Sequence, residues 1–233
     1  MTRVHRAPAL PTGDEKVRAV RGMFDAIAPR YDLVNRVMTF GMDVGWRRRT
    51  VAALSLPPGS VVLDVACGTG DLCREAQRQG MRSVGVDSSA GMLAASRTTA
   101  PLVRADALAL PMRDASIDGV TCGFALRNVA DLKTLLDEMA RVLRPGGRAA
   151  LLEVSQPHSR PLRMGYELYF RRVVPIIGAA LSDRDAYAYL PRSTAYLPEP
   201  HELMRMLVRA GFERVRRRPL SLGAAQLIVG TRA

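Results

Sequence analysis

The sequence predicts an α/β protein with a mostly parallel sheet that carries helices on both faces. Two short apolar runs, 61–66 and 83–87, are typical of strands that are buried on both sides. Stretches with helical periodicity alternate with strand-like runs, and this alternation favours βαβ units. At 233 residues the chain is long enough for one such domain with added segments. We therefore expect a single domain over 16–233 after a disordered lead-in at 1–15.

The N-terminal part of this domain, 16–56, is predicted to form a helical cover. Its apolar residues recur at helical spacing, and Pro29 and Gly41 divide the stretch into about three short helices. The turn sequence Pro57-Pro58-Gly59 then separates the cover from the first strand.

Five strands with helices between them are expected in the middle of the chain. The strands are placed at 61–66, 83–87, 102–104, 117–122 and 149–154, and the helices at 71–79, 90–97 and 132–143. The sequence Arg144-Pro145-Gly146-Gly147 is predicted to end the last of these helices.

The C-terminal part first breaks this alternation and then resumes it. Residues 160–192 are helical in pattern and rich in bulky apolar and basic residues, and an insertion at this point would cover the ligand-binding edge of the sheet. A helix at 199–210 follows. Two final strands at 212–216 and 225–231, near a turn at 221–223, bring the predicted sheet to seven strands.

Composition and charge restrict the classes of function. The 34 basic and 22 acidic residues give a net charge of +12, which favours anionic partners. No aromatic residues interleave with the basic clusters as base-stacking surfaces require. The chain also lacks an Asn-Pro-Pro-Tyr or Asp-Pro-Pro-Tyr motif that would hold an extruded base. Nucleic acid is therefore not expected as a partner.

Apolar patterning and cysteine usage bear on the cellular location. The sequence contains no apolar run of about 18 residues and no apolar signal-peptide core. The three cysteines make no disulfide framework, and Cys67 and Cys73 lack the second pair of ligands that a zinc site needs. We expect a cytoplasmic protein without a bound metal.

A glycine-rich loop, Asp64-Val-Ala-Cys-Gly-Thr-Gly70, stands between the first strand and the following helix. Gly68 and Gly70 let the backbone approach a ligand closely, and the helix N-terminus offers free N–H groups. Asp87, at the end of the second strand, is placed to accept both ribose hydroxyls of a nucleoside cofactor. Dinucleotide loops need three glycines to admit a pyrophosphate, whereas Ala66 and the acidic Asp64 suit a cationic ligand that carries an amino acid. S-adenosylmethionine meets both requirements.

Two further groups of residues are candidates for contact with this cofactor. Asp106 and Ala107, after the third strand, would lie beside the adenine, and the alternative for Asp106 is a solvated turn residue. Tyr31 and Asp32, with Asn35 behind them, would close over the cofactor. The alternative for these three, which the residues alone favour, is an amphipathic helix that only packs on the sheet.

Several sequence blocks resemble, in order, those of the menaquinone/ubiquinone C-methyltransferase family. The resemblance extends from about Val17 to Arg232, nearly the whole chain. The N-terminal block and the Leu-Arg-Asn block are specific to the family, whereas the glycine loop is common to most class I methyltransferases. The matching blocks are Phe24–Ala28, Tyr31–Asn35, Phe40–Gly41 with Trp46–Arg48, Phe124–Asn128, Arg141–Gly147, Leu152–Ser155 and Tyr187–Ser193.

The resemblance implies a Rossmann-like class I methyltransferase fold. It also implies methyl transfer from S-adenosylmethionine to a ring carbon of a prenylated quinol, foremost demethylmenaquinol. The family's cofactor contacts fall on positions that match Thr69, Asp87, Asp106 and Ala107, and a serine that also touches the cofactor is replaced here by Gly123.

The chain departs from the family pattern at other positions as well. Ala125 replaces a glycine, and Asp43 stands where many members have histidine. Residues 223–228 read Gly-Ala-Ala-Gln-Leu-Ile where the family usually has Gly-Ile-x-x-Leu-His. These departures bear on which acceptor is methylated more than on the type of reaction. A polyprenyl benzoquinol, another phenolic acceptor, or a noncatalytic role in a quinone-synthesis assembly therefore stay as alternatives.

Arg127 is the candidate catalytic residue. A quinol ring carbon ortho to a hydroxyl becomes nucleophilic as the hydroxyl loses its proton, so positioning and charge do most of the work. Arg127 follows the fourth strand, where it would stabilise the phenolate or hold a water that removes the proton. The alternative is a structural ion pair. His158 is a weaker candidate base, because a surface-loop histidine is the simpler interpretation.

Residues 160–181 combine bulky apolar side chains with arginines. A polyprenyl tail stays in the bilayer, and a basic-flanked apolar helix of this kind would dip into the headgroup region of an anionic membrane. The alternative is that the apolar side packs on the sheet or within a homodimer.

Overall fold

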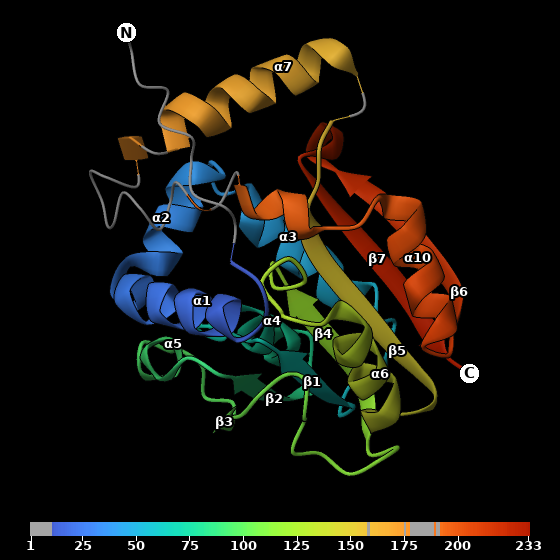
Figure 1. Cartoon of the computed structure of the whole chain (residues 1–233). Coiled ribbons are helices and arrows are strands. Elements are labelled where there is room, and N and C mark those ends of the chain that lie inside the picture. Colours follow the sequence, from blue (N-terminus) through green and yellow to red (C-terminus); the bar gives the residue numbers. More distant parts are fainter. Residues whose placement is uncertain (1–10, 158, 175, 178–188, 190–191) are drawn as a thin grey trace, which may run out of the picture.

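A seven-stranded sheet forms the centre of the computed structural model, which describes residues 11–157, 159–174, 176–177, 189 and 192–233 (Figure 1). The strand order is β3-β2-β1-β4-β5-β7-β6. Strands β1 to β5 are parallel, and β7 pairs antiparallel with both β5 and β6. The predicted α/β class with a mostly parallel sheet is therefore confirmed. The strands are β1 (Val61–Val65), β2 (Arg82–Asp87), β3 (Leu102–Arg104), β4 (Ile117–Gly123), β5 (Leu143–Val154), β6 (Phe212–Leu220) and β7 (Ala225–Arg232).

Helices cover both faces of this sheet. Successive strand residues point to opposite faces, so a strand buried on both sides needs apolar residues throughout. On one face, Leu135 of α6 and Leu203 of α10 belong to the same core as Leu63. On the other face, Leu72 of α4 belongs to a second core with Val62 and residues of α3. The helices are α1 (Gly13–Ile27), α2 (Tyr31–Met38), α3 (Met42–Ala52), α4 (Asp71–Arg78), α5 (Ala90–Ala94), α6 (Leu132–Val142), α7 (Arg160–Leu168) and α10 (Pro200–Arg209).

Several element boundaries differ from the sequence prediction. α1 already begins at Gly13, inside the expected lead-in, whose residues 1–10 lie outside the described part of the chain. α5 ends at Ala94, and the chain then turns so that Thr98 packs against Gly70. A Cβ on Gly70 would lie 2.6 Å from the Thr98 methyl carbon, so this approach requires glycine.

The two longest strands were predicted too short. β5 begins at Leu143, because Leu143 pairs with Ile117 before the register shifts to Arg148 opposite Gly119. The Arg-Pro-Gly-Gly sequence therefore forms an irregularity within the strand as well as ending the helix. β6 continues to Leu220, because it pairs with β7 along its whole length despite a second register shift after Glu213.

The helices α1, α2 and α7 lie toward the carboxyl ends of the parallel strands, while α3 packs on one face of the sheet (Figure 1). Tyr169, in the π-helical turn Tyr169–Val173 after α7, donates a hydrogen bond to the Met38 carbonyl of α2 at 2.7 Å. The predicted cover and the predicted insertion therefore meet. Within the described residues, every helix is too short or too polar to cross a bilayer.

Candidate active site

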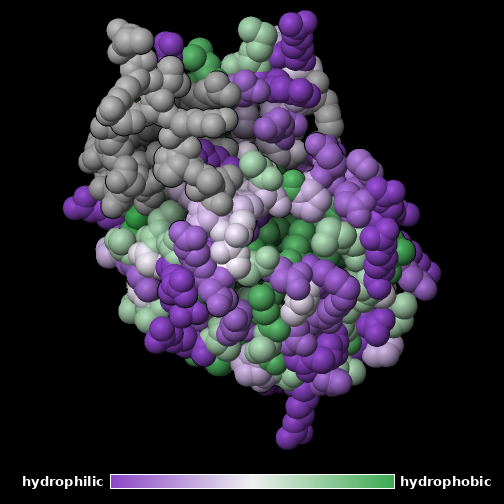
Figure 2. Space-filling model, viewed as in Figure 1, coloured by the Kyte–Doolittle hydropathy of each residue, from purple (hydrophilic) through white to green (hydrophobic). Residues whose placement is uncertain are grey.

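A first cavity, of about 120 Å³, lies at the carboxyl ends of the parallel strands. Its wall combines the loops after β1, β2 and β3, the end of β4, and the helices α1 and α2. This is where open α/β sheets bind ligands. Figure 2 shows the same side of the molecule as Figure 1, with hydrophobic residues gathered in a hollow near the centre of the view. The predicted site residues in the wall are Tyr31, Gly68, Asp87, Asp106, Ala107 and Gly123.

Asp87 is held in place by the backbone around it. One carboxylate oxygen accepts the Gly68 N–H at 2.8 Å, and the other accepts the Ser89 N–H at 2.8 Å. Burial raises the pKa of Asp87, and these two hydrogen bonds oppose that shift. Each oxygen retains a lone pair for a further donor, so the carboxylate can accept two hydroxyl groups from a ligand in the cavity.

Asp106 fits both interpretations that the sequence allowed. Its side chain accepts the Leu108 N–H at 2.9 Å, which is an ordinary turn contact. Asp106 and Ala107 also line the first cavity. The turn therefore fixes the loop that closes one side of this cavity.

Asp64, Thr69 and Gly70 are placed differently from the expectation, because none of the three lies in the cavity wall. Asp64 is only 1% exposed and accepts hydrogen bonds from the Thr121 hydroxyl at 2.8 Å and the Cys73 thiol at 3.7 Å. Burial raises the pKa of Asp64 to about 7. Asp64 therefore lies beneath the glycine loop, where neighbouring polar side chains occupy its carboxylate.

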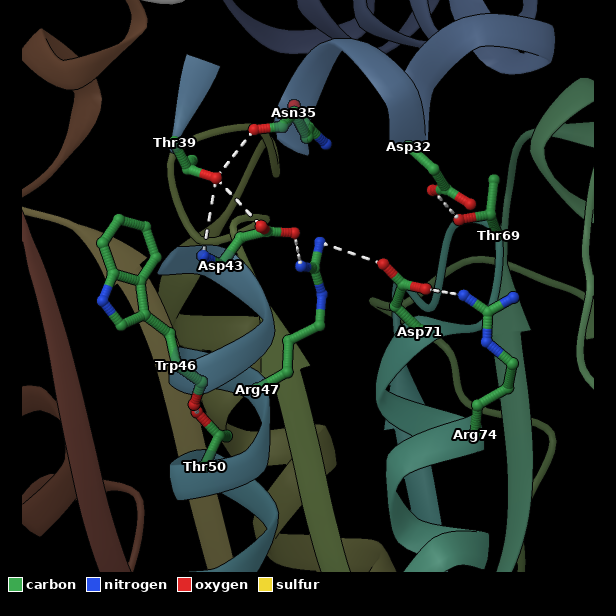
Figure 3. Close-up of polar contacts among 10 residues, drawn as sticks. All are labelled: Asp32, Asn35, Thr39, Asp43, Trp46, Arg47, Thr50, Thr69, Asp71 and Arg74. Carbon is green, nitrogen blue, oxygen red and sulfur yellow. Dashed lines mark hydrogen bonds and ion pairs between the residues drawn. The ribbon is translucent and has the colours of Figure 1, made fainter. Parts of the chain in front are cut away.

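Thr69 links the glycine loop to the N-terminal cover. Its hydroxyl donates to Asp32 of α2 at 2.6 Å (Figure 3). Asp25 of α1 makes a second link, because it accepts the Gly91 N–H at 2.8 Å at the start of α5. The cover is therefore attached to two of the loops that form the first cavity.

A second cavity, of about 190 Å³ and mostly apolar, lies beside the first. It is enclosed by α1, α2, α3, α7 and the ends of β4 and β5. Phe24, Tyr31 and Phe124 line both cavities. These three rings therefore form the boundary across which a group would pass from one cavity to the other.

Arg127 lines the second cavity and is also a member of a buried ion pair. It is 5% exposed and pairs with Glu153, which is 0% exposed. The nitrogen of this pair, Nη1, also donates to the Phe124 carbonyl at 3.0 Å, and Nε donates to the Ser193 hydroxyl at 3.1 Å. Arg127 therefore forms the structural ion pair and also borders the second cavity, and its catalytic role stays a prediction. His158 lies outside the described residues.

A second ion pair lies in the same wall, between Asp43 and Arg47 of α3 (Figure 3). The Thr39 hydroxyl donates to Asp43 at 2.9 Å, and Arg47 lies 3.3 Å from Asp71, which in turn pairs with Arg74. Asp43 is the carboxylate that the described residues contribute to the wall of the second cavity. This chain of alternating charges anchors α3 to α4.

Sequence reasoning did not single out Phe24, Phe124 and Glu153 as site residues. Each stands inside a block that resembles the family, and this was the available signal. Their roles depend on contacts between segments that are distant in the chain, such as Arg127 with Glu153.

Comparison with known proteins places the chain in a family. It matches the ubiE/COQ5 methyltransferase family over residues 12–232. It is 45% identical over 232 residues to the demethylmenaquinone methyltransferase of Deinococcus radiodurans, with 94% of this chain and 96% of that chain covered. It is 43% identical over 230 residues to the demethylmenaquinone methyltransferase of Roseiflexus castenholzii, with 95% and 96% covered.

Solved structures show the same fold at lower sequence identity. A SAM-dependent methyltransferase from Thermotoga maritima superposes with a TM-score of 0.66 and 22% identity, over 92% of this chain and 100% of that chain. Phosphoethanolamine N-methyltransferase 2 of Haemonchus contortus, in complex with S-adenosyl-L-methionine, superposes with a TM-score of 0.57 and 15% identity, over 79% and 52% of the two chains. The chain therefore belongs to the ubiE/COQ5 methyltransferase family and is an S-adenosylmethionine-dependent methyltransferase.

Proposed function

We propose that the chain transfers the methyl group of S-adenosylmethionine to a ring carbon of demethylmenaquinol, which yields menaquinol. The observation that carries this proposal is the pair of cavities that share Phe24, Tyr31 and Phe124. One cavity presents a carboxylate and backbone groups, as a nucleoside cofactor requires, and the other presents the apolar wall that a quinol ring requires. The names of the relatives from Deinococcus and Roseiflexus support the same acceptor.

In this proposal the first cavity holds the cofactor. Asp87 accepts the two ribose hydroxyls, Asp106 and Ala107 lie beside the adenine, and Tyr31 covers the cofactor from α2. Gly68 leaves open space beside this cavity, whereas the missing side chain of Gly123, which also lines it, makes room for Leu72. Thr69, Gly70 and Asp64 act indirectly, by holding the loop and the cover in position.

Arg127 supplies the charge for the reaction in the second cavity. When bound, S-adenosylmethionine would supply the methyl group to the ring carbon beside the ionised quinol hydroxyl and would leave as S-adenosylhomocysteine. The ring carbon would release its hydrogen as a proton, and the oxygen would take up a proton again to give menaquinol. Arg127 stays charged and cannot accept a proton itself. It therefore stabilises the phenolate or holds the water that removes the hydroxyl proton, while Glu153 fixes its position.

A labelled-cofactor assay tests the acceptor. Reduced demethylmenaquinone, a reduced polyprenyl benzoquinone and a short phenol are each incubated with methyl-labelled S-adenosylmethionine, and the products are identified by mass spectrometry. We expect label in the demethylmenaquinol product. Labelled phenol without labelled quinol would contradict the quinol assignment, and an absence of turnover with all three would favour a noncatalytic role.

We also propose that the protein works in the cytoplasm and contacts the inner face of the membrane peripherally. The physical reason is the acceptor, whose polyprenyl tail stays in the bilayer while its ring must reach the second cavity. A homodimer that covers residues 160–181 is the competing arrangement.

A further inference from the structure

Exposed apolar side chains are concentrated in two segments that help to enclose the second cavity. In the described part of the chain twelve large hydrophobic side chains are exposed, and ten of them lie in the segments 33–44 and 162–176. The other two are Val208 and Leu222. Isolated exposed apolar residues are ordinary on a protein surface, but a contiguous group marks an interaction site. We refer to the exposed apolar residues of these two segments as the apolar rim.

The two halves of the apolar rim meet at the second cavity. Phe40, which is 75% exposed, lines this cavity, as does the exposed Met42. The Phe40 ring lies 5.8 Å from the ring of Tyr169, which lines the cavity from the other half. The hydrogen bond from Tyr169 to Met38 joins the same two segments. The apolar interior of the cavity therefore continues onto the surface at the apolar rim.

α7 presents its apolar side chains to solvent instead of packing them on the sheet. None of its nine residues is buried, and Met164 and Leu168 are among the most exposed apolar residues. In Figure 2, hydrophobic and hydrophilic residues both reach the surface at the top of the view, where Figure 1 shows α7. The alternative that this side packs on the sheet therefore does not hold for the exposed apolar residues of α7, whereas Tyr166 lines the second cavity.

Among the described residues the fully exposed charges beside the apolar rim are positive, and the one acidic side chain of 160–174, Glu167, is half-buried. Arg36, Arg160, Arg163 and Arg172 are exposed, and none of them forms an ion pair with another described side chain. The two acidic side chains of 30–44 are engaged elsewhere, because Asp32 accepts from Thr69 and Asp43 pairs with Arg47. An apolar surface with unpaired arginines at its edge is complementary to the anionic face of a bilayer.

We infer that the apolar rim docks on an anionic lipid bilayer, and that the tail of the acceptor passes from the bilayer through the rim while its ring enters the second cavity. This inference rests on the proposed function, because only a lipid-tailed acceptor needs such an entrance. It extends the membrane contact beyond 160–181 to the α2–α3 corner at Phe40. The ring then reaches the methyl group without the tail leaving an apolar environment.

Vesicle flotation with the full chain tests the docking. Vesicles of phosphatidylcholine alone are compared with vesicles that also contain phosphatidylglycerol, at low and high salt. We expect binding that rises with phosphatidylglycerol and falls with salt. Arg163→Gln with Arg172→Gln should weaken binding roughly 10- to 30-fold, whereas the matched pair Arg216→Gln with Arg218→Gln, on β6 away from the rim, should change it little.

The apolar contribution is tested by Leu33→Ser, Met164→Ser and Leu168→Ser combined. These side chains are exposed and do not line the cavity, so the fold and the site are retained. We expect at least a tenfold loss of vesicle binding, and no loss for Val208→Ser on α10. Binding that is indifferent to lipid charge and to both sets of variants would overturn the inference.

A second readout separates this inference from the proposed function. The triple-serine variant should methylate a short-tailed, water-soluble demethylmenaquinol at the wild-type rate, and lose activity only on long-tailed quinol in vesicles. If wild-type protein methylates neither quinol, the proposed function fails while the flotation result still stands. If the triple-serine changes abolish a dimer seen by analytical ultracentrifugation and leave vesicle binding unchanged, the apolar rim is an interface between two copies.

Discussion

The first cavity is formed by loops at the ends of neighbouring parallel strands, whereas the second is enclosed mainly by helices from two distant parts of the chain. The first contains a carboxylate, Asp87, that is held by backbone N–H groups two and nineteen residues away. The second is mostly apolar, and its charged side chains are held in ion pairs such as Arg127 with Glu153. The two regions therefore offer a ligand different physical means of recognition.

This difference explains why one cavity is visible in the sequence and the other is not. Hydrogen bonds to a nucleoside require particular residue types at fixed places on adjacent strands, and these leave a motif. An apolar cavity requires only volume and hydrophobicity, which many residues supply. Changes in the two regions should therefore affect different properties of the protein.

The largest expected effect concerns the ion pair behind the second cavity. Glu153→Gln leaves the Arg127 guanidinium buried without its partner, and breaking a buried pair in this way typically costs about 3–5 kcal/mol. We expect a matching fall in the free energy of unfolding, measured by urea denaturation. Glu138→Gln, which disrupts a partly exposed pair with Arg141, is the control and should cost much less. Equal falls in the free energy of unfolding of the two variants would show that burial does not determine how much the Arg127–Glu153 pair stabilises the fold.

The next effect concerns pH and the carboxyl group beneath the glycine loop. The folded chain holds the proton of Asp64 up to a pKa of about 7, whereas an ordinary carboxyl in the unfolded chain releases it near 3.8. Folding then takes up a proton between these values, so the free energy of unfolding falls as the pH rises towards 7. Between pH 5 and pH 8 this titration should lower the free energy of unfolding of the wild-type protein by roughly 3 kcal/mol. Asp64→Asn should abolish this part of the pH dependence. Parallel stability curves for the two proteins would show that Asp64 titrates normally.

A third effect concerns affinity at the first cavity. Asp87→Ala removes the carboxylate proposed to accept the ribose hydroxyls, and hydrogen bonds to a charged group contribute about 1.5–3 kcal/mol. We expect S-adenosylmethionine to bind roughly 10- to 150-fold more weakly by calorimetry. Thermal melting serves as the control for folding, because Asp87 also accepts the Gly68 and Ser89 N–H groups. Unchanged affinity in a folded variant would place the ribose elsewhere.

The smallest effect concerns the link between the glycine loop and the cover. Thr69→Val removes the hydrogen bond to Asp32 and should weaken S-adenosylmethionine binding by about 1 kcal/mol, or roughly fivefold. Thr69→Ser keeps the hydroxyl and should restore most of the affinity. If valine and serine bind the cofactor equally well, the link does not hold the cover over the first cavity.

The sequence predicted the sheet, its flanking helices and most of the first cavity, because these leave local patterns. The apolar runs around Val62 and Leu63 and the carboxylate of Asp87 follow directly from strand position. The sequence could not show that Thr121 of β4 and Cys73 of α4 donate hydrogen bonds to Asp64, and contact of Asp64 with the cofactor stays a prediction. Phe24 and Phe124 escaped notice because their shared position exists only after α1 packs over the sheet.

The central claim is that the two cavities divide cofactor binding from acceptor chemistry. Arg127→Lys tests it most directly, because the lysine keeps the charge in the second cavity but loses the planar group that contacts Glu153, Ser193 and Phe124 together. The measurement is the dissociation constant of S-adenosylmethionine for this variant by calorimetry, beside its turnover with demethylmenaquinol. The division predicts unchanged cofactor affinity with lower turnover in a folded protein. Cofactor affinity that falls as far as in Asp87→Ala would contradict it.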